Sequence, residues 1–217
     1  MPEFSCILFD LDGTIVDSAP GITATLAYTF GQLGLPIPTP AELVAYVGPP
    51  ILDSFRDLAG FTPEQSQQAL EIYRGKYLAT GVFDASVYPG LAGVLKAIHA
   101  SGIPLSLATS KPETPATLIL EHYDLLKYFD VITGASDDEK RSAKADVVEE
   151  ALTRLRAFGA DVSRPVMVGD RSHDVHGAAA HDVPTIFVRW GYGSPAEEVG
   201  TIGAADDAAE LRRLLGV

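Results

Sequence analysis

The sequence predicts an α/β protein: a parallel sheet with helices on both faces, and an all-helical segment inserted after the first strand. Two observations lead to this prediction. Along most of the chain, short apolar stretches rich in β-branched and aromatic residues alternate with segments of helical periodicity. From about residue 19 to residue 87 the alternation stops, and helical patterns follow one another without a convincing strand. Strand–helix alternation is typical of a parallel sheet covered on both faces.

Five stretches are predicted as strands, and most of them end in small or polar residues or are followed directly by them. In the last two, Pro165 and Pro184 stand at the first position, where the missing N–H of proline is tolerated. The strands are expected at 6–9, 103–110, 129–136, 165–170 and 184–190.

Helices are expected between and after these strands, at 91–101, 115–123, 144–158, 172–181 and 206–215. The helical patterns inside 19–87 are separated by proline-containing turns. We therefore expect a catalytic core made of residues 1–17 and 88–217, and a helical cap domain made of residues 18–87.

Composition limits the classes of function. The chain has 217 residues, 47% of them apolar, which is enough for a sizeable core. A net charge of −13 argues against binding to nucleic acid or to anionic membranes, since both depend on Lys and Arg. The single cysteine, Cys6, excludes an internal disulfide and indicates a reducing compartment. Without a signal peptide or membrane segment in view, we expect a cytoplasmic monomer or weak dimer.

Two acidic residues, Asp10 and Asp12, follow the first strand directly. Side chains alternate along a strand, so these two carboxylates would point the same way and repel each other. A cation between them would remove the repulsion, and oxygen ligands favour Mg²⁺. The alternative is a solvated turn, because Asp-Gly is a common turn signal. These residues alone leave both interpretations open.

A second pair of acids follows the predicted strand at 165–170. Asp170 ends that strand, and Asp174 lies in the first turn of the next helix, where it could simply be a helix cap. Ligands of open parallel sheets bind beyond the carboxyl ends of the strands, where the strand order reverses. If the strands at 6–9 and 165–170 are neighbours there, Asp10 and Asp170 come together and a metal site results.

Hydroxyl and basic residues offer partners for a phosphate group. Thr109 and Ser110 end the strand at 103–110 near a helix N-terminus, a setting that suits phosphate oxygens. Lys111 is expected to be solvated. Further along, the chain offers three more cations: Lys140, Arg141 and Lys144. Lys144 is the best placed of the three, because it stands at the start of a helix.

Taken in order, these motifs resemble the haloacid dehalogenase-like superfamily. The resemblance rests on Asp-Leu-Asp-Gly-Thr at 10–14, Thr109, Lys144 and Gly-Asp-Arg-Ser-His-Asp at 169–174, and it covers the whole chain. It implies a Rossmann-like core with an inserted α-helical (C1-type) cap. Val-Gly-Pro-Pro at 47–50 and Trp-Gly-Tyr-Gly at 190–193 look like the phosphoglycolate phosphatase and 5′-nucleotidase branch. Many relatives carry Lys-Pro where this chain has Lys144-Ala145, so Lys140 stays an alternative to Lys144.

The resemblance also implies a mechanism. Asp10 would be the nucleophile that forms an aspartyl-phosphate, and Asp12 would be the general acid and base. Mg²⁺ would be held by Asp10, the Asp12 carbonyl and Asp170. Thr109, Ser110 and Lys144 would bind the phosphoryl oxygens, with Asp174 orienting Lys144 or a metal-bound water. The expected substrate is a small phosphorylated metabolite, either phosphoglycolate-like or a nucleoside monophosphate.

Two other functions stay open. A phosphomutase like β-phosphoglucomutase shares the core motifs but needs a basic residue in its cap loop, and 47–55 contains none. A non-catalytic ligand sensor would have no need for a nucleophile paired with an acid. True dehalogenases of the superfamily do without the second acid, so Asp12 argues against that activity. Three basic residues of the cap could contact the substrate: Arg56, Arg74 and Lys76.

Overall fold

The centre of the molecule is a five-stranded parallel sheet with the order β4-β1-β5-β6-β7. The structure is a computed structural model that describes residues 3–217. Its strands are β1 (Cys6–Phe9), β4 (Leu105–Leu107), β5 (Pro165–Gly169), β6 (Thr185–Val188) and β7 (Gly203–Ala205). The predicted α/β class is therefore confirmed. Because β1 lies between β4 and β5, the strand order reverses at β1, as the prediction of the site requires.

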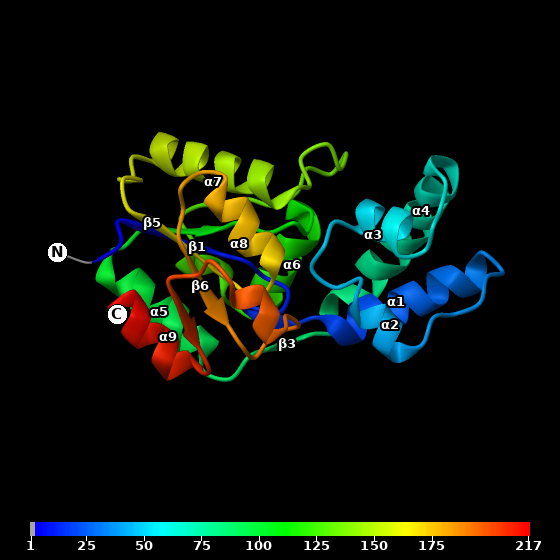
Figure 1. Ribbon diagram of the computed structural model, residues 1–217, viewed down its shortest axis with the longest axis horizontal. Helices are drawn as coiled ribbons and strands as arrows, with labels where there is room; N and C mark the ends of the chain where they lie inside the picture. Colours follow the sequence, from blue (N-terminus) through cyan, green and yellow to red (C-terminus); the bar gives the residue numbers. More distant parts are fainter. Residues whose placement is uncertain (1–2) are drawn as a thin grey trace.

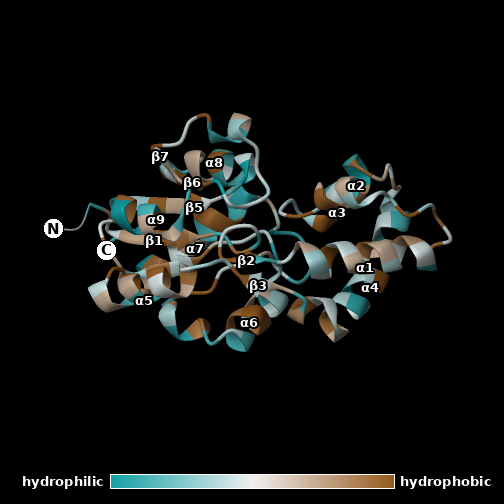
Figure 2. Cartoon of the chain, turned by 90° about the horizontal axis from the view of Figure 1, so that it is seen from below, coloured by the Kyte–Doolittle hydropathy of each residue, from teal (hydrophilic) through white to brown (hydrophobic). Residues whose placement is uncertain are grey.

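Helices cover both faces of the sheet (Figure 1). Along β1, Ile7 and Phe9 face the core shared with α5, α6 and α9, whereas Cys6 and Leu8 face α7 and α8. The bounds are α5 (Leu91–Ser101), α6 (Glu113–His122), α7 (Lys144–Phe158), α8 (Ser172–Ala179) and α9 (Ala208–Leu215). The predicted helices 91–101 and 144–158 are confirmed to the residue. In Figure 2, α9 carries both hydrophobic and hydrophilic residues, as a helix lying on a sheet does.

Four further helices lie beside the sheet rather than on it (Figure 1, blue to cyan). They are α1 (Ala19–Gln32), α2 (Pro40–Val44), α3 (Ile51–Asp57) and α4 (Pro63–Ala79), followed by the 3-10 turn η1 (Gly81–Phe83). Thr39 and Thr62 begin α2 and α4 with capping boxes. We call residues 18–87 the helical insertion. The chain enters and leaves it through the antiparallel pair of β2 (Val16–Asp17) and β3 (Ser86–Val87).

The predicted strand at 129–136 is wrong as a regular strand. The segment runs beside β4 and exchanges backbone hydrogen bonds with it, for example from Leu107 N–H to the Val131 carbonyl at 3.0 Å. Its strand pairing is nevertheless limited to isolated bridges, at Val131 and Ala135. The Asp130 carboxylate accepts the N–H of Leu105 at 2.9 Å. This N–H is therefore not available to a backbone carbonyl of a neighbouring strand. A short 3-10 turn, η2 (Leu126–Tyr128), precedes the segment.

Strands β2, β3 and β7 were not predicted, because they are two or three residues long and carry little apolar pattern. Among residues 3–217, no helix is long and apolar enough to cross a membrane.

Candidate active site

The carboxyl ends of β1, β4 and β5 bring five buried polar residues to one edge of the sheet. Asp10 follows β1, Thr109 lies two residues after β4, and Asp170 follows β5. Lys144 begins α7 and Asp174 lies in the first turn of α8, and both side chains are also buried. The register of the parallel strands, with Phe9 opposite both Leu107 and Val168, places these strand ends at one level.

Lys144 is the cation at the centre of this group. Its Nζ lies 2.6 Å from Asp10 Oδ1 and 2.7 Å from Asp174 Oδ1, and it donates to the carbonyl of Ala108 at 3.0 Å. Burial alone would lower the pKa of Lys144, but the two carboxylates outweigh burial and raise it, so the side chain is an ammonium. The structure places Lys144, and not Lys140, at the site: the Lys140 side chain is 85% exposed and pairs with Asp138.

Asp170 and Asp174 are held by hydrogen bonds. The Thr14 hydroxyl donates to Asp170 Oδ1 at 3.2 Å, and the N–H of Tyr192 donates to Asp170 Oδ2 at 2.7 Å. Asp174 Oδ2 accepts the N–H groups of Asp170 and Arg171 at 3.1 and 3.0 Å, which caps α8. Asp174 therefore caps α8, which is the alternative that the sequence left open, and it also forms an ion pair with Lys144.

Asp10, Asp170 and Asp174 form a cluster whose carboxylate oxygens lie within 4.8 Å of one another. Burial raises the pKa of Asp10 to about 7 and that of Asp170 well above its usual value, with the neighbouring acids adding to the effect. A hard divalent cation prefers oxygen ligands, and it would stabilise these carboxyl groups in their deprotonated form. The side chain of Asp12 is not part of this cluster.

Asp12 is paired instead with Lys111. Lys111 Nζ lies 3.1 and 3.0 Å from the two carboxylate oxygens of Asp12, and the Ser18 hydroxyl donates to Asp12 Oδ1 at 2.6 Å. The expectation that Lys111 is solvated is therefore wrong, since the residue is only 8% exposed. The reason is tertiary: its ammonium lies 4.7 Å from the ring centre of Tyr77, which the helical insertion contributes.

The charges at the site do not balance. Four buried carboxylates (Asp10, Asp12, Asp170 and Asp174) face two buried ammonium groups (Lys111 and Lys144). When all four carboxylates are ionised, two negative charges are in excess, which is the amount that one divalent cation would neutralise. The residues present therefore fit a divalent cation, and the ion expected from the sequence is Mg²⁺.

Two predicted phosphate-binding residues are buried beside these pairs. The Thr109 hydroxyl accepts the N–H of Lys111 at 3.2 Å. The Ser110 hydroxyl is buried and has no hydrogen-bond partner in the described part of the chain. Both residues come from the turn between β4 and α6, so their position follows from the end of the strand.

A cavity of about 300 Å³ extends from this edge into the helical insertion. Asp12, Ser110 and Lys111 line it from the side of the core. Arg74 is the one predicted cap residue that lines it: its guanidinium lies 2.7 Å from Glu139 and donates to the carbonyl of Asp137 at 2.8 Å.

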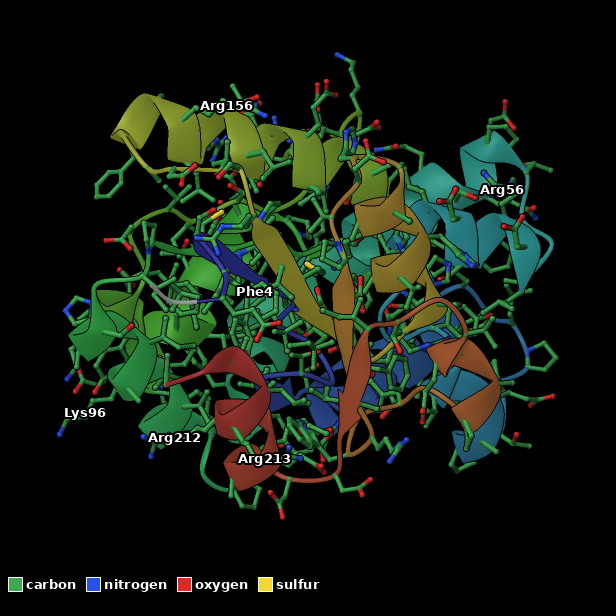
Figure 3. All side chains as sticks on the ribbon, turned by 60° about the vertical axis from the view of Figure 1, so that its left-hand side comes forward. Phe4, Arg56, Lys96, Arg156, Arg212 and Arg213 are labelled. Carbon is green, nitrogen blue, oxygen red and sulfur yellow. The ribbon has the colours of Figure 1, made fainter. Side chains whose placement is uncertain are left out.

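Arg56 and Lys76 are not brought to the site. The Arg56 side chain is 62% exposed, pairs with Asp53 and Asp57, and is labelled on the outer side of the insertion in Figure 3. Lys76 lies over the ring of Tyr28, at 5.4 Å from its centre. Within residues 3–217, neither side chain lines the cavity.

The contacts of several supporting residues could not be predicted from the sequence. Gly13 has a φ of +86°, and a Cβ there would lie 2.3 Å from Asp170 Oδ2, so only glycine lets the chain pass this carboxylate. Trp190 donates from its indole N–H to the carbonyl of Thr14 at 3.1 Å. His173 and His176, which flank Asp174 in a pattern that could suggest zinc, are not in the carboxylate cluster of the described residues.

Arg171 connects the core to the insertion. It donates to the carbonyl of Val47 at 2.8 Å and pairs with Glu197 at 3.1 Å. Its side chain lies against Gly48, which has a φ of +103°. The Val-Gly-Pro-Pro segment of the insertion is thus held next to the N-terminus of α8.

Comparisons with known proteins find relatives of similar sequence and fold. The haloacid dehalogenase-like hydrolase family model matches residues 7–188. The chain is 40% identical to the Mycobacterium tuberculosis protein named Tyrosine-protein kinase PtkA, covering 97% of this chain and 72% of that one. It is 35% identical to a 5′-nucleotidase of Pseudomonas aeruginosa, covering 88% and 85%. A predicted phosphatase from Clostridium acetobutylicum has the same fold, with a TM-score of 0.91, 35% identity and 99% of both chains covered.

Proposed function

Because the chain belongs to the haloacid dehalogenase-like hydrolase family, we propose that it is a Mg²⁺-dependent phosphatase that hydrolyses phosphomonoesters of small metabolites. One observation carries the proposal: two buried carboxylates, Asp10 and Asp12, lie two positions apart in the chain and have different lysine partners. Relatives named 5′-nucleotidase and phosphoglycolate phosphatase, at 35% and 33% identity, support the same reaction class.

Asp10 is the proposed nucleophile. Lys144 holds its Oδ1, which leaves the other carboxylate oxygen to attack phosphorus. A bond forms between that oxygen and phosphorus, and the bond from phosphorus to the ester oxygen breaks with its electron pair. Asp12 gives a proton to the departing oxygen. In the second step water attacks phosphorus, Asp12 takes a proton from the water, and phosphate leaves with Asp10 restored.

Mg²⁺ would be held by Asp10, the Asp12 carbonyl and Asp170, and would neutralise charge on the phosphoryl group. Asp174 has a different role in this proposal. One of its oxygens accepts two backbone N–H groups and the other lies against Lys144, so it is already engaged. Asp174 is therefore proposed to position Lys144, which with Thr109 and Ser110 binds the phosphoryl oxygens.

The helical insertion, residues 18–87, is proposed to be a cap domain over the core of residues 1–17 and 88–217. Support comes from the cavity, whose walls come partly from the insertion and partly from the turn after β4. A cap in this position excludes water from the reacting atoms and selects the substrate.

The test is phosphate release from the purified protein over a panel of small phosphate esters, with Mg²⁺ and after chelation. We expect release that depends on the cation. Full turnover in EDTA would contradict the metal dependence. Absence of turnover on the whole panel, with metal binding retained, would favour the sensor alternative.

The second candidate function is transfer of the phosphoryl group to the hydroxyl group of an acceptor molecule instead of to water. The 40% identity to the protein named Tyrosine-protein kinase PtkA favours it, and the mutase alternative belongs to the same class. The two candidates differ in the fate of the phosphoryl group. A phosphatase releases one inorganic phosphate for each ester consumed, whereas a transferase modifies an acceptor or converts β-glucose 1-phosphate to glucose 6-phosphate without net release.

A further inference from the structure

We propose that the leaving group of the substrate is uncharged and carries a planar ring, as the nucleoside of a nucleoside 5′-monophosphate does. This inference rests on the proposed phosphatase activity and specifies its substrate class. It excludes the small carboxylate-bearing alternative, phosphoglycolate. Four features of the cavity carry it: its walls, its size, its charges and its unpartnered hydroxyl groups.

The cavity is lined by the residue that would protonate the leaving group, Asp12. Its other walls are mainly aromatic and aliphatic side chains of the insertion: Ile22, Tyr46, Ile51, Leu70, Tyr73 and Tyr77. The rings of Tyr73 and Tyr77 lie parallel, at 9° and 5.4 Å between centres. Flat apolar walls of this kind bind planar rings by stacking.

The size of the cavity also favours a ring. Glycolate has five non-hydrogen atoms and takes the space of about three water molecules, roughly 90 Å³. The cavity offers about 300 Å³, which would leave most of its apolar wall in contact with water. A ring with an attached sugar fills such a space and covers that wall.

The charges of the cavity disfavour a carboxylate. Both cations in its wall are already paired: Lys111 with Asp12, and Arg74 with Glu139. Asp137 adds a third acid to the lining, so three carboxylates stand against two cations. The carboxylate of a glycolate group would find no unpaired cation in this lining and would be repelled.

Two hydroxyl groups of the lining residues call for a polar ligand. Tyr77 is 4% exposed and Ser110 is 6% exposed. Within residues 3–217, neither hydroxyl has a hydrogen-bond partner. Buried hydroxyls are normally paired. The phosphoryl group would pair the Ser110 hydroxyl, and a polar edge of an uncharged ring would pair the Tyr77 hydroxyl.

The experiment compares kcat/KM for uridine and adenosine 5′-monophosphate, phenyl phosphate and phosphoglycolate. We expect the nucleotides to exceed phosphoglycolate at least tenfold. Phenyl phosphate, which has the ring without the sugar, distinguishes an aryl from a nucleoside leaving group. Its kcat/KM is expected to lie between those of the nucleotides and of phosphoglycolate. Equal or higher kcat/KM for phosphoglycolate would overturn the inference and leave the phosphatase proposal intact. No turnover of any ester would overturn both.

Variants test the walls directly. Tyr73→Leu removes one ring and is expected to raise KM for the nucleotides about tenfold, a typical loss for one stacking partner, with phosphoglycolate unchanged. Tyr28→Leu is the matched control, because Tyr28 belongs to the insertion but does not line the cavity. Tyr77→Phe keeps the ring and removes only the unpartnered hydroxyl, so it is expected to fold and to raise KM for the nucleotides. If Tyr73→Leu and Tyr77→Phe each changed KM by the same factor for the nucleotides and for phosphoglycolate, the inference would be contradicted.

Discussion

At the scale of single residues, the site depends on two lysines that pair with three of its four buried carboxylates. Lys144 binds Asp10 and Asp174, and Lys111 binds Asp12. The two acids that we propose to react, Asp10 and Asp12, are therefore held in different surroundings although they are two positions apart. Different surroundings are how neighbouring carboxylates take different roles, one as nucleophile and one as acid and base.

Replacing Lys144 tests this arrangement. In Lys144→Met, the carboxylates of Asp10 and Asp174 lose their buried partner. We expect the metal-free protein to lose about 3–5 kcal/mol of unfolding free energy, the usual cost of breaking a buried ion pair. Urea unfolding of the metal-free protein measures it.

Lys140→Met is the control, because Lys140 is exposed and its pair with Asp138 lies on the surface. Its unfolding free energy should change by less than about 0.5 kcal/mol. Equal stability of the two variants would show that Lys144 does not hold the carboxylates together.

Most of the site residues could be predicted from the sequence because each follows a strand or begins a helix. Asp10, Thr109, Lys144 and Asp170 occupy such positions, and strand order alone brings them together. Lys111 could not be predicted. Its partner Asp12 lies 99 residues away and its ring contact comes from the insertion, so nothing local in the sequence marks it as buried.

At the scale of helices and strands, the sequence predicted long periodic segments well and short edge segments poorly. Helices α5 and α7 begin and end where their apolar periodicity does. The stretch at 129–136 has the composition of a strand, but a side chain, Asp130, takes the N–H of Leu105 that a strand would use. Side-chain competition of this kind depends on tertiary position and not on local propensity.

One contact between elements has a predictable pH dependence. Glu197, in the 3-10 turn η3 (Pro195–Glu198), accepts the N–H groups of Ser172 and Ser194 and pairs with Arg171. Burial would raise the pKa of Glu197, but these donors outweigh burial and lower it from 4.5 to about 2. Because the folded-state pKa is the lower one, the carboxylate stabilises the fold above pH 4.5, and this contribution is lost as the pH falls towards 2.

We therefore expect Glu197→Gln to be less stable than the unmodified protein above pH 4.5, with the difference shrinking as the pH falls towards 2. Urea unfolding at several pH values measures the difference. Glu149→Gln, on the exposed face of α7, controls for the loss of one surface charge. A difference that grows on acidification would contradict the assignment.

At the scale of the whole molecule, the fold class and the family could be read from the sequence, but the substrate could not. The cavity is assembled from the insertion and from the turn after β4, and its aromatic walls come from α4 and the segment before α3. Which of the insertion's side chains face inward depends on how its helices pack. That is why Arg56 and Lys76 were candidates from sequence and Tyr73 and Tyr77 were not.

The metal proposal predicts a change in the stability of the whole fold. A cation that binds only the folded protein raises its unfolding free energy by about 2.7 kcal/mol when its concentration is 100 times Kd. We expect Mg²⁺ to raise the melting temperature of the unmodified protein and to have little effect on Asp170→Asn. Asp53→Asn is the control, because the Asp53 side chain is 44% exposed and lies outside the carboxylate cluster. An equal shift in all three proteins would place the cation elsewhere.

The most direct measurement of the central claim is the site of phosphorylation in protein quenched with acid during turnover. Asp10 as nucleophile predicts that the phosphoryl group is found on the peptide that contains Asp10, and that Asp10→Asn neither carries it nor releases phosphate. A phosphoryl group on any other residue, or full turnover by Asp10→Asn, would contradict the account.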